Sequence, residues 1–206
     1  MSIFTIYKPY DILSFMNDFN SVVLLGCKHC GKSTHGKALA SFLKTDFFDT
    51  DSVLEQIVGT TFQNYYRQAG VAKFMQAEEL ACQKIVSENS GKQIVVATGG
   101  GICDNPPALN QLRPLGKFIF LELDLQFSVE RILSKIHWDA TLQNWANAPA
   151  YIQQAKPATL AQIKNILMEK YTQRFELYRK IADVTVPLKN QSAEENFKLI
   201  LQAIGI

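Results

Sequence analysis

The chain has 206 residues, of which 47% are hydrophobic and 19% charged, and its formal net charge is +2. This length suits one domain with a substantial core, and the small net charge gives no reason to expect nucleic acid or an anionic membrane surface as a partner. No apolar run approaches the roughly 20 residues that span a bilayer, so we expect a monomeric cytoplasmic protein that binds small molecules.

The first segment, residues 1–20, contains apolar and aromatic residues but no motif that we can interpret. Acidic residues interrupt it and no basic stretch precedes it, so it does not have the pattern of a signal peptide. We treat it as an N-terminal extension and expect a single domain over residues 21–206.

The strongest motif follows the apolar run 22–25. The sequence GCKHCGKS at 26–33 matches the GxxxxGK[ST] pattern of a P-loop, with a predicted strand before it and a predicted helix over 33–43 after it. Its glycines let backbone N–H groups surround a phosphate at the helix N-terminus. Lys32 then reaches the β- and γ-phosphates of ATP, and the Ser33 hydroxyl binds Mg²⁺. The predicted phosphate site comprises Gly26, Cys27, Lys28, His29, Cys30, Gly31, Lys32, Ser33 and Thr34.

The same loop contains a CxxC pair, Cys27 and Cys30, and the chain has two further cysteines, Cys82 and Cys103. Four scattered cysteines are too few for a disulfide framework, and a structural zinc site needs a second pair of ligands. We therefore favour a phosphate loop over a zinc site, and keep an oxidation-sensitive thiol pair as a side hypothesis.

Downstream, short apolar runs alternate with amphipathic stretches. Such alternation favours parallel βαβ units with helices on both faces of one sheet. Little regular periodicity is found from His137 to Pro157, so we expect an irregular, mobile insertion there. Strands are predicted at 47–48, 93–97, 117–123 and 184–186, and helices around 52–90, 107–113, 125–136, 159–181 and 193–204.

Two of these strands end in residues that suit a ligand site. The strand at 47–48 ends in Asp49 and Asp51, which places carboxylates at the carboxyl edge of the sheet beside the phosphate loop. The strand at 93–97 runs into three glycines at 99–101, which would admit a ligand against bare backbone.

In their order along the chain, these motifs resemble those of the shikimate kinase family. The resemblance runs from about Ser21 to the C-terminus. It implies a three-layer α/β/α P-loop kinase fold with five parallel strands ordered 2-3-1-4-5 and a helical lid inserted at about 137–158. It also implies phosphorylation of shikimate by ATP, a step of aromatic amino acid biosynthesis. The shared elements are GCKHCGKST, FFDTD, the Gly59-Thr60-Thr61 turn, Glu78-Glu79, VVATGGG and Arg174–Tyr178.

The resemblance also implies roles for single residues. Asp49 matches an acid near Mg²⁺, and Asp51 matches the carboxylate that orients or deprotonates the attacking hydroxyl. Arg131 matches an arginine near the adenine, the segment at 190–192 matches the adenine loop, and Arg174 matches an arginine that pairs with the acceptor's carboxylate. The aspartates could instead simply cap a helix, and the other charges could be solvated. The implied acceptor pocket comprises Asp51, Glu78, Gly99, Gly100, Gly101 and Arg174.

The acceptor pocket departs from the family at one position. The family usually has an arginine shortly before the acid that Glu78 matches, and this chain has Met75 there. A thioether cannot hold a carboxylate as a planar guanidinium does. The loss is worth about 2–3 kcal/mol of acceptor binding unless Lys73 or Arg67 compensates.

The predicted lid departs as well, because it lacks the family's Arg-Pro-Leu-Leu string. Lys156, followed by Pro157, lies close to the expected position of that arginine. A lysine supplies the charge without the planar fork. We therefore predict Lys156 as a catalytic residue beside Lys32 and Asp51.

These departures leave three functions open: a shikimate kinase, a P-loop kinase of a different small hydroxylated acceptor, and a catalytically degenerate nucleotide-binding paralogue. Met75 supports the second, because it makes the pocket less cationic. The missing arginines support the third, but Lys32, Ser33, Asp49 and Asp51 are all present and speak against it.

Overall fold

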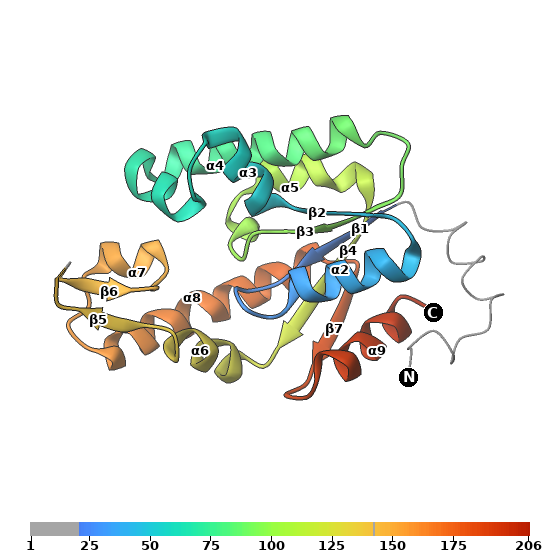
Figure 1. The fold of residues 1–206 in the computed structure, drawn as a ribbon. Helices are drawn as coiled ribbons and strands as arrows, with labels where there is room; N and C mark the ends of the chain where they lie inside the picture. Colours follow the sequence, from blue (N-terminus) through green and yellow to red (C-terminus); the bar gives the residue numbers. More distant parts are fainter. Residues whose placement is uncertain (1–20, 142) are drawn as a thin grey trace.

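The computed structural model describes residues 21–141 and 143–206, and the predicted extension at 1–20 lies outside the described residues. A five-stranded parallel sheet lies between two layers of helices (Figure 1). Its order, β2-β3-β1-β4-β7, is the predicted order 2-3-1-4-5 counted within this sheet, so the predicted fold is confirmed. The strands are β1 (Ser21–Leu25), β2 (Asp46–Asp49), β3 (Ile94–Ala97), β4 (Gly116–Leu123) and β7 (Val184–Leu188).

Successive side chains of the central strands enter opposite helical layers. In β1, Val22 and Leu24 pack with the layer of α2 and α9, whereas Val23 and Leu25 pack into the larger cluster on the other face. A strand that is buried on both faces needs a continuous apolar run, and this is the pattern that the sequence contains. The two layers include α2 (Lys32–Leu43) and α9 (Ala193–Ala203) on one face and α4 (Phe62–Glu88), α5 (Pro106–Leu112) and α8 (Leu160–Ile181) on the other.

Glycines break the stretch that the sequence predicted as helical over 52–90. α3 (Thr50–Val58) ends at Gly59, whose φ of 71° is left-handed, and α4 starts three residues later. Within α4, Gly70 has φ 79° and ψ 173°, which kinks the helix. In the described part of the chain, no helix is long and apolar enough to cross a membrane. The remaining elements of the main body are η2 (Ile102–Asp104), η3 (Arg113–Leu115) and α6 (Leu125–Leu133).

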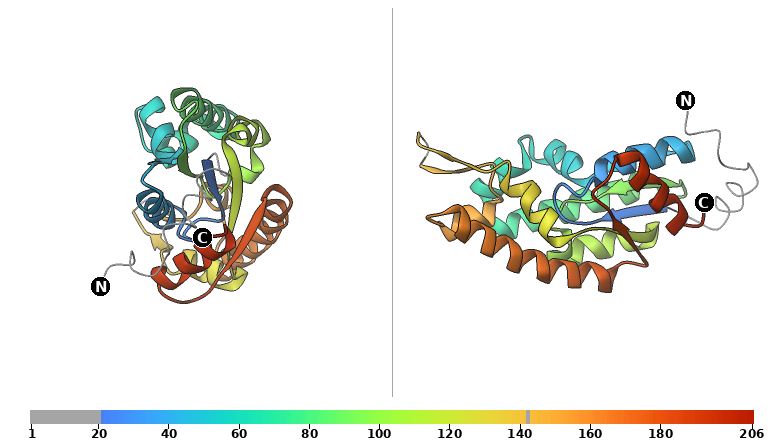
Figure 2. Two further views of the ribbon diagram at one scale, coloured as in Figure 1. Left: turned by 90° about the vertical axis from the view of Figure 1, so that its right-hand side faces the viewer. Right: turned by 90° about the horizontal axis from the view of Figure 1, so that it is seen from below.

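The insertion after α6 is a compact arm, which we call the lid. The prediction of an irregular segment was wrong: β5 (His137–Asp139) and β6 (Asn144–Ala146) pair antiparallel, and α7 (Ala150–Ala155) follows. Strands of three residues are too short to show a periodicity in sequence, and a cross-strand pair of Trp138 and Trp145, with ring centroids 5.3 Å apart, joins them instead. The lid extends from the end of the molecule opposite to the C-terminus (Figure 1 and Figure 2).

Candidate active site

The P-loop holds its lysine against its own backbone. Gly31 takes the left-handed conformation (φ 97°) before α2, and Lys32 is buried at the start of that helix. The Lys32 Nζ donates hydrogen bonds to the carbonyl oxygens of Gly26 (2.8 Å) and Cys27 (2.9 Å). A Cβ on Gly26 would lie 2.9 Å from the Leu121 carbonyl oxygen, so this position requires glycine. The loop therefore presents one buried cation at a crowded helix N-terminus.

The surroundings of the loop also suit an anion. The first turn of α2 contains no acidic residue, and Ser33 and Thr34 are exposed there. Arg131 on α6 donates from Nη1 to the His29 carbonyl oxygen at 3.2 Å, which places a guanidinium beside the loop. Burial, together with neighbouring cations that include Lys28, lowers the pKa of His29 to about 4, so this imidazole is neutral at pH 7.

Ser33 and Asp49 form an oxygen-rich corner next to the loop. The Ser33 hydroxyl donates to Asp49 Oδ2 at 2.7 Å, and Asp49 Oδ1 accepts from the backbone N–H of Asp51 at 3.1 Å. Asp49 thus caps α3 with one oxygen, as the plainer interpretation predicted, and faces the P-loop with the other. A hydroxyl and a carboxylate are ligands that Mg²⁺ accepts in P-loop kinases, so these residues fit the ion.

Two carboxylates, the buried Glu78 and the half-buried Asp51, face Gly99 at the end of β3. A Cβ on Gly99 would lie 2.7 Å from Asp51 Oδ1 and 3.1 Å from Glu78 Oε1. Burial raises the pKa of Asp51 to about 6, with a further contribution from Asp49. Burial likewise raises the pKa of Glu78 to about 7, although the amide of Asn105 donates to its Oε2 at 2.9 Å and opposes the shift. Carboxyl groups with pKa values near neutrality are candidates for proton transfer and hydroxyl binding.

The other two glycines lie against the P-loop and Arg174. A Cβ on Gly100 would lie 2.7 Å from the Lys28 backbone nitrogen, and one on Gly101 would lie 2.9 Å from Arg174 Nη2. Arg174, on α8, also donates from Nη1 to the Gly100 carbonyl oxygen at 3.2 Å. The predicted acceptor residues Asp51, Glu78 and Arg174 therefore meet at one glycine turn beside the P-loop.

The thiols of the P-loop are poorly suited to metal or redox chemistry. Cys27, Cys30, Cys82 and Cys103 are all buried and free. Burial raises the pKa of Cys27, which disfavours the thiolate that oxidation requires. Over residues 21–141 and 143–206 we find no group of three or more His, Cys, Asp or Glu side chains that could hold a metal ion.

Comparison with known proteins shows the family of this chain. The sequence profile of the family described as Shikimate kinase matches residues 28–205. The chain belongs to the shikimate kinase family. A shikimate kinase of Lactococcus lactis subsp. lactis (strain IL1403) is 31% identical over 190 residues, which cover 90% of this chain and 99% of the relative. Shikimate kinase 1 of Hamiltonella defensa is 30% identical over 192 residues, with 92% and 96% covered.

A solved structure of a shikimate kinase shares the fold. The shikimate kinase from Acinetobacter baumannii in complex with shikimate superposes with a TM-score of 0.71 and 24% identity, covering 94% of this chain and 96% of that one. This shikimate kinase family member is therefore a P-loop phosphotransferase that acts on a hydroxyl group.

The structure of this shikimate kinase family member adds residues that our reading of the sequence missed. Asp104 accepts from Arg174 Nε (3.2 Å) and Nη2 (2.9 Å) and lies 3.0 Å from Lys170 Nζ. Tyr151 of the lid lies over Arg174, with the guanidinium carbon 5.5 Å from its ring centroid. One signal was available in sequence: Lys170 and Arg174 are four residues apart, which places both cations on one face of α8.

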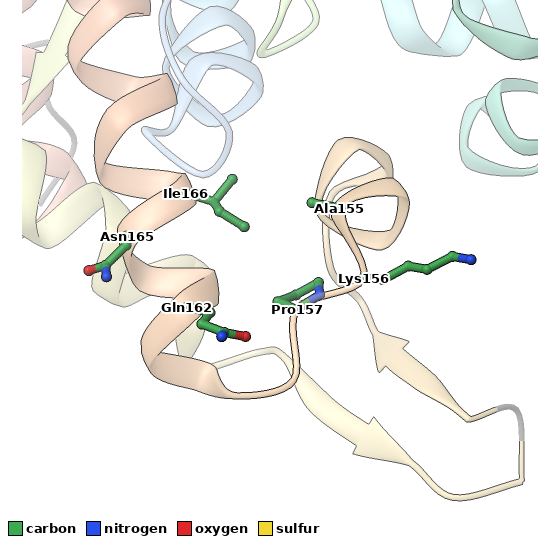
Figure 3. Close-up of a pocket in the computed structure, with 6 residues that line it drawn as sticks. All are labelled: Ala155, Lys156, Pro157, Gln162, Asn165 and Ile166. Carbon is green, nitrogen blue, oxygen red and sulfur yellow. The ribbon is translucent and has the colours of Figure 1, made fainter.

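Lys156 makes no contact with the group formed by Asp104, Lys170 and Arg174 among the interactions found in the described residues. It caps α7 in the left-handed conformation (φ 49°), and its side chain is exposed. Figure 3 shows that this side chain points away from α8. Among the described residues, no hydrogen bond or ion pair links it to the P-loop. Lys156 borders a cavity of about 380 Å³ that is lined by Ala155, Lys156, Pro157, Gln162, Asn165 and Ile166.

The position of Met75 receives no replacement cation from the two predicted sources. Met75 is half-buried on α4, and its carbonyl oxygen accepts from Asn105 Nδ2 at 2.9 Å. Arg67 donates to Asn64 on the surface of the same helix, and Lys73 is exposed. In the described part of the chain, neither cation has a hydrogen bond or ion pair with Glu78, whereas Arg174 and its neighbour Lys170 both contact Asp104 beside the glycines.

Proposed function

We propose that this protein phosphorylates shikimate with ATP, forming shikimate 3-phosphate and ADP. The observation that carries the proposal is the convergence of Asp51, Glu78 and Arg174 on the glycines that follow β3, directly beside the P-loop. Two carboxylates that can bind hydroxyls and one arginine that can bind a carboxylate match an acceptor that has both kinds of group.

The P-loop binds ATP, the phosphate donor. Its backbone N–H groups and Lys32 bind the phosphates of ATP, and Arg131 lies beside the loop, where it borders the nucleotide. Ser33 and Asp49 would hold Mg²⁺, which neutralises charge on the β- and γ-phosphates when it is bound. The two loop carbonyls hold Lys32 Nζ at the loop, where the phosphates of ATP would bind.

The acceptor side positions and deprotonates the attacking hydroxyl. Asp51 takes the proton as the hydroxyl oxygen attacks the γ-phosphorus, and the bond from that phosphorus to the bridging oxygen of ADP breaks. With a pKa of about 6, Asp51 is largely ionised at pH 7.5 and still close enough to neutrality to act as a base. Glu78 holds another hydroxyl, and Arg174 holds the carboxylate.

Closure of the lid would complete the site. Lys156 stands at the turn between α7 and α8, and Trp145 Nε1 donates to the Pro157 carbonyl oxygen at 2.7 Å, which fixes that turn. In related phosphotransfer reactions, a cation that arrives on a moving segment neutralises the transferring phosphate. We assign that role to Lys156.

A kinase of a different hydroxylated acceptor is the second candidate, and Met75 is the observation that favours it. A pocket with an apolar side chain in place of an arginine binds carboxylates less tightly.

An assay of ADP release with Mg·ATP tests both candidates. Shikimate is compared with a panel of hydroxy acids and sugars, with Lys32→Ala as the blank and Lys37→Ala, an exposed lysine of the same helix, as the matched control. We expect turnover with shikimate that is absent in the blank and retained in the control. Turnover with another acceptor alone would replace the proposal, and ATP binding without any turnover would indicate a degenerate paralogue.

A further inference from the structure

Arg174 already holds a carboxylate that belongs to the protein. Its Nε and Nη2 both donate to Asp104 Oδ2, and its Nη1 donates to the Gly100 carbonyl oxygen. The Nε and Nη2 pair is one of the two edges with which a guanidinium can grip a carboxylate bidentately. Asp104 therefore already occupies that edge of Arg174 when an acceptor binds.

Asp104 is held firmly in this position. It ends the short helix η2 directly after the acceptor glycines, and its backbone N–H donates to the Gly101 carbonyl oxygen at 2.9 Å. Lys170, one turn before Arg174 on α8, binds the same Oδ2 at 3.0 Å. Although burial opposes ionisation, Arg174 and Lys170 together lower the pKa of Asp104, so the residue stays anionic at neutral pH.

The charges that lie directly around Arg174 follow from these contacts. Lys170 adds a second positive charge, and Asp104 contributes one negative charge that contacts both cations. Met75 on α4 carries no charge. A bound carboxylate would thus share its arginine with an internal carboxylate, and the two like charges would repel one another.

We propose that Asp104 is a specificity-determining residue, an internal carboxylate that competes with the acceptor's carboxylate for Arg174 and weakens the binding of anionic acceptors. This inference rests on the proposed function, because it uses the assignment of Arg174 to the acceptor's carboxylate. The competing explanation is a structural one, in which Asp104 only holds Arg174 in place and its removal weakens acceptor binding.

The test is to remove the charge of Asp104 while keeping its shape. In Asp104→Asn, and in Asp104→Ser as a second variant, we expect KM for shikimate and its Kd by calorimetry in the presence of ADP to fall about tenfold. KM for ATP should change less than twofold. The uncharged methyl ester of shikimate should bind the variants and the native protein about equally, because it does not compete with a carboxylate.

Asp183→Asn is the matched control. Asp183 also pairs with an arginine, Arg113, through two hydrogen bonds, but it lies at the start of β7 and outside the pocket. Its substitution should leave both constants for shikimate unchanged.

An unchanged or increased Kd for shikimate in folded Asp104 variants would overturn the inference in favour of the structural role, and so would failure of both variants to fold. If the native protein does not turn over shikimate, the proposed activity fails, yet the comparison of Kd values still decides the role of Asp104. If shikimate binds neither the native protein nor the variants, both proposals fall.

Discussion

The phosphate loop and the proposed acceptor pocket share one edge of the sheet. The loop offers mainly backbone groups, whereas the pocket offers side chains. The phosphate site is formed largely by backbone groups, and its lysine is fixed by two carbonyl oxygens of the loop itself. The proposed acceptor pocket is formed by side chains from α3, α4 and α8, and its arginine is held by the side chain of Asp104, 70 residues away.

This difference predicts where substitutions change the site. Backbone groups do not change when a side chain is substituted, so the N–H groups of the loop are present whatever side chains stand at Cys27, His29 and Cys30. A pocket made of side chains changes its charge with every substitution, and Met75 is such a change. We therefore expect the loss of a group on the phosphate side to lower turnover. We expect the gain of a positive charge on the acceptor side to strengthen the binding of shikimate.

Asp51 lies between the P-loop and the proposed acceptor pocket. We expect its substitution to lower kcat more than any other substitution proposed below. Asp51→Asn should lower kcat about 10³-fold, because the base is lost while the shape is kept. The native enzyme should lose kcat/KM as the pH falls through about 6, where Asp51 becomes protonated, and the variant should lack this limb. Asp46→Asn, an exposed acid at the start of β2, is the control. The same pH limb in both proteins would exclude Asp51 as the base.

Substitution of Lys156 in the lid tests whether phosphate transfer needs a cation from outside the P-loop. Lys156→Ala should lower kcat about 100-fold and leave the Kd for ATP nearly unchanged, because the charge acts on the transferring phosphate. Lys156→Arg should retain the rate, and Lys164→Ala, an exposed lysine of α8, should have no effect. Equal losses of turnover and of ATP binding in Lys156→Ala would contradict this role.

Restoring the arginine of the acceptor pocket should improve the enzyme. Met75→Arg is expected to lower KM for shikimate about 30-fold, which corresponds to one charge-assisted hydrogen-bond pair of about 2 kcal/mol. Gln76→Arg adds the same charge at an exposed neighbouring position of α4 and should not change KM. A similar decrease in both variants would show a general electrostatic attraction instead of a specific contact.

We expect the buried carboxylate of Glu78 to lower the free energy of unfolding of the protein. Its pKa in the folded protein, about 7, lies above the ordinary value of 4.5, so the folded state binds more protons than the unfolded state between these values. The free energy of unfolding should therefore fall as the pH rises from about 4.5 to about 7.

Glu78→Gln should lose the part of this slope that Glu78 contributes, most clearly between about pH 6 and 7, above the raised pKa of Asp51. It should be more stable than the native protein at pH 8 by about 1–3 kcal/mol, measured by chemical denaturation without ligand. Glu79→Gln is the control, because Glu79 binds Gln111 near the surface. Equal slopes in the native protein and in Glu78→Gln would show that another group is responsible.

The sequence by itself determined the fold and the position of the P-loop. Continuous apolar runs marked the strands of a sheet that is buried on both faces, and the P-loop, Asp49 and Asp51 follow directly from strand ends. These features depend on residues that are close together in the chain, which is why local patterns find them.

Only the tertiary structure decided the charge of the acceptor pocket and the form of the lid. The pairing of Asp104 with Lys170 and Arg174 joins a turn after β3 to α8, and the burial that raises the pKa of Glu78 comes from elements far along the chain. The lid hairpin likewise depends on a contact between two tryptophans across strands of three residues. Contacts of this kind leave no periodic trace in sequence, because their energy comes from packing between segments and not from the propensity of either segment.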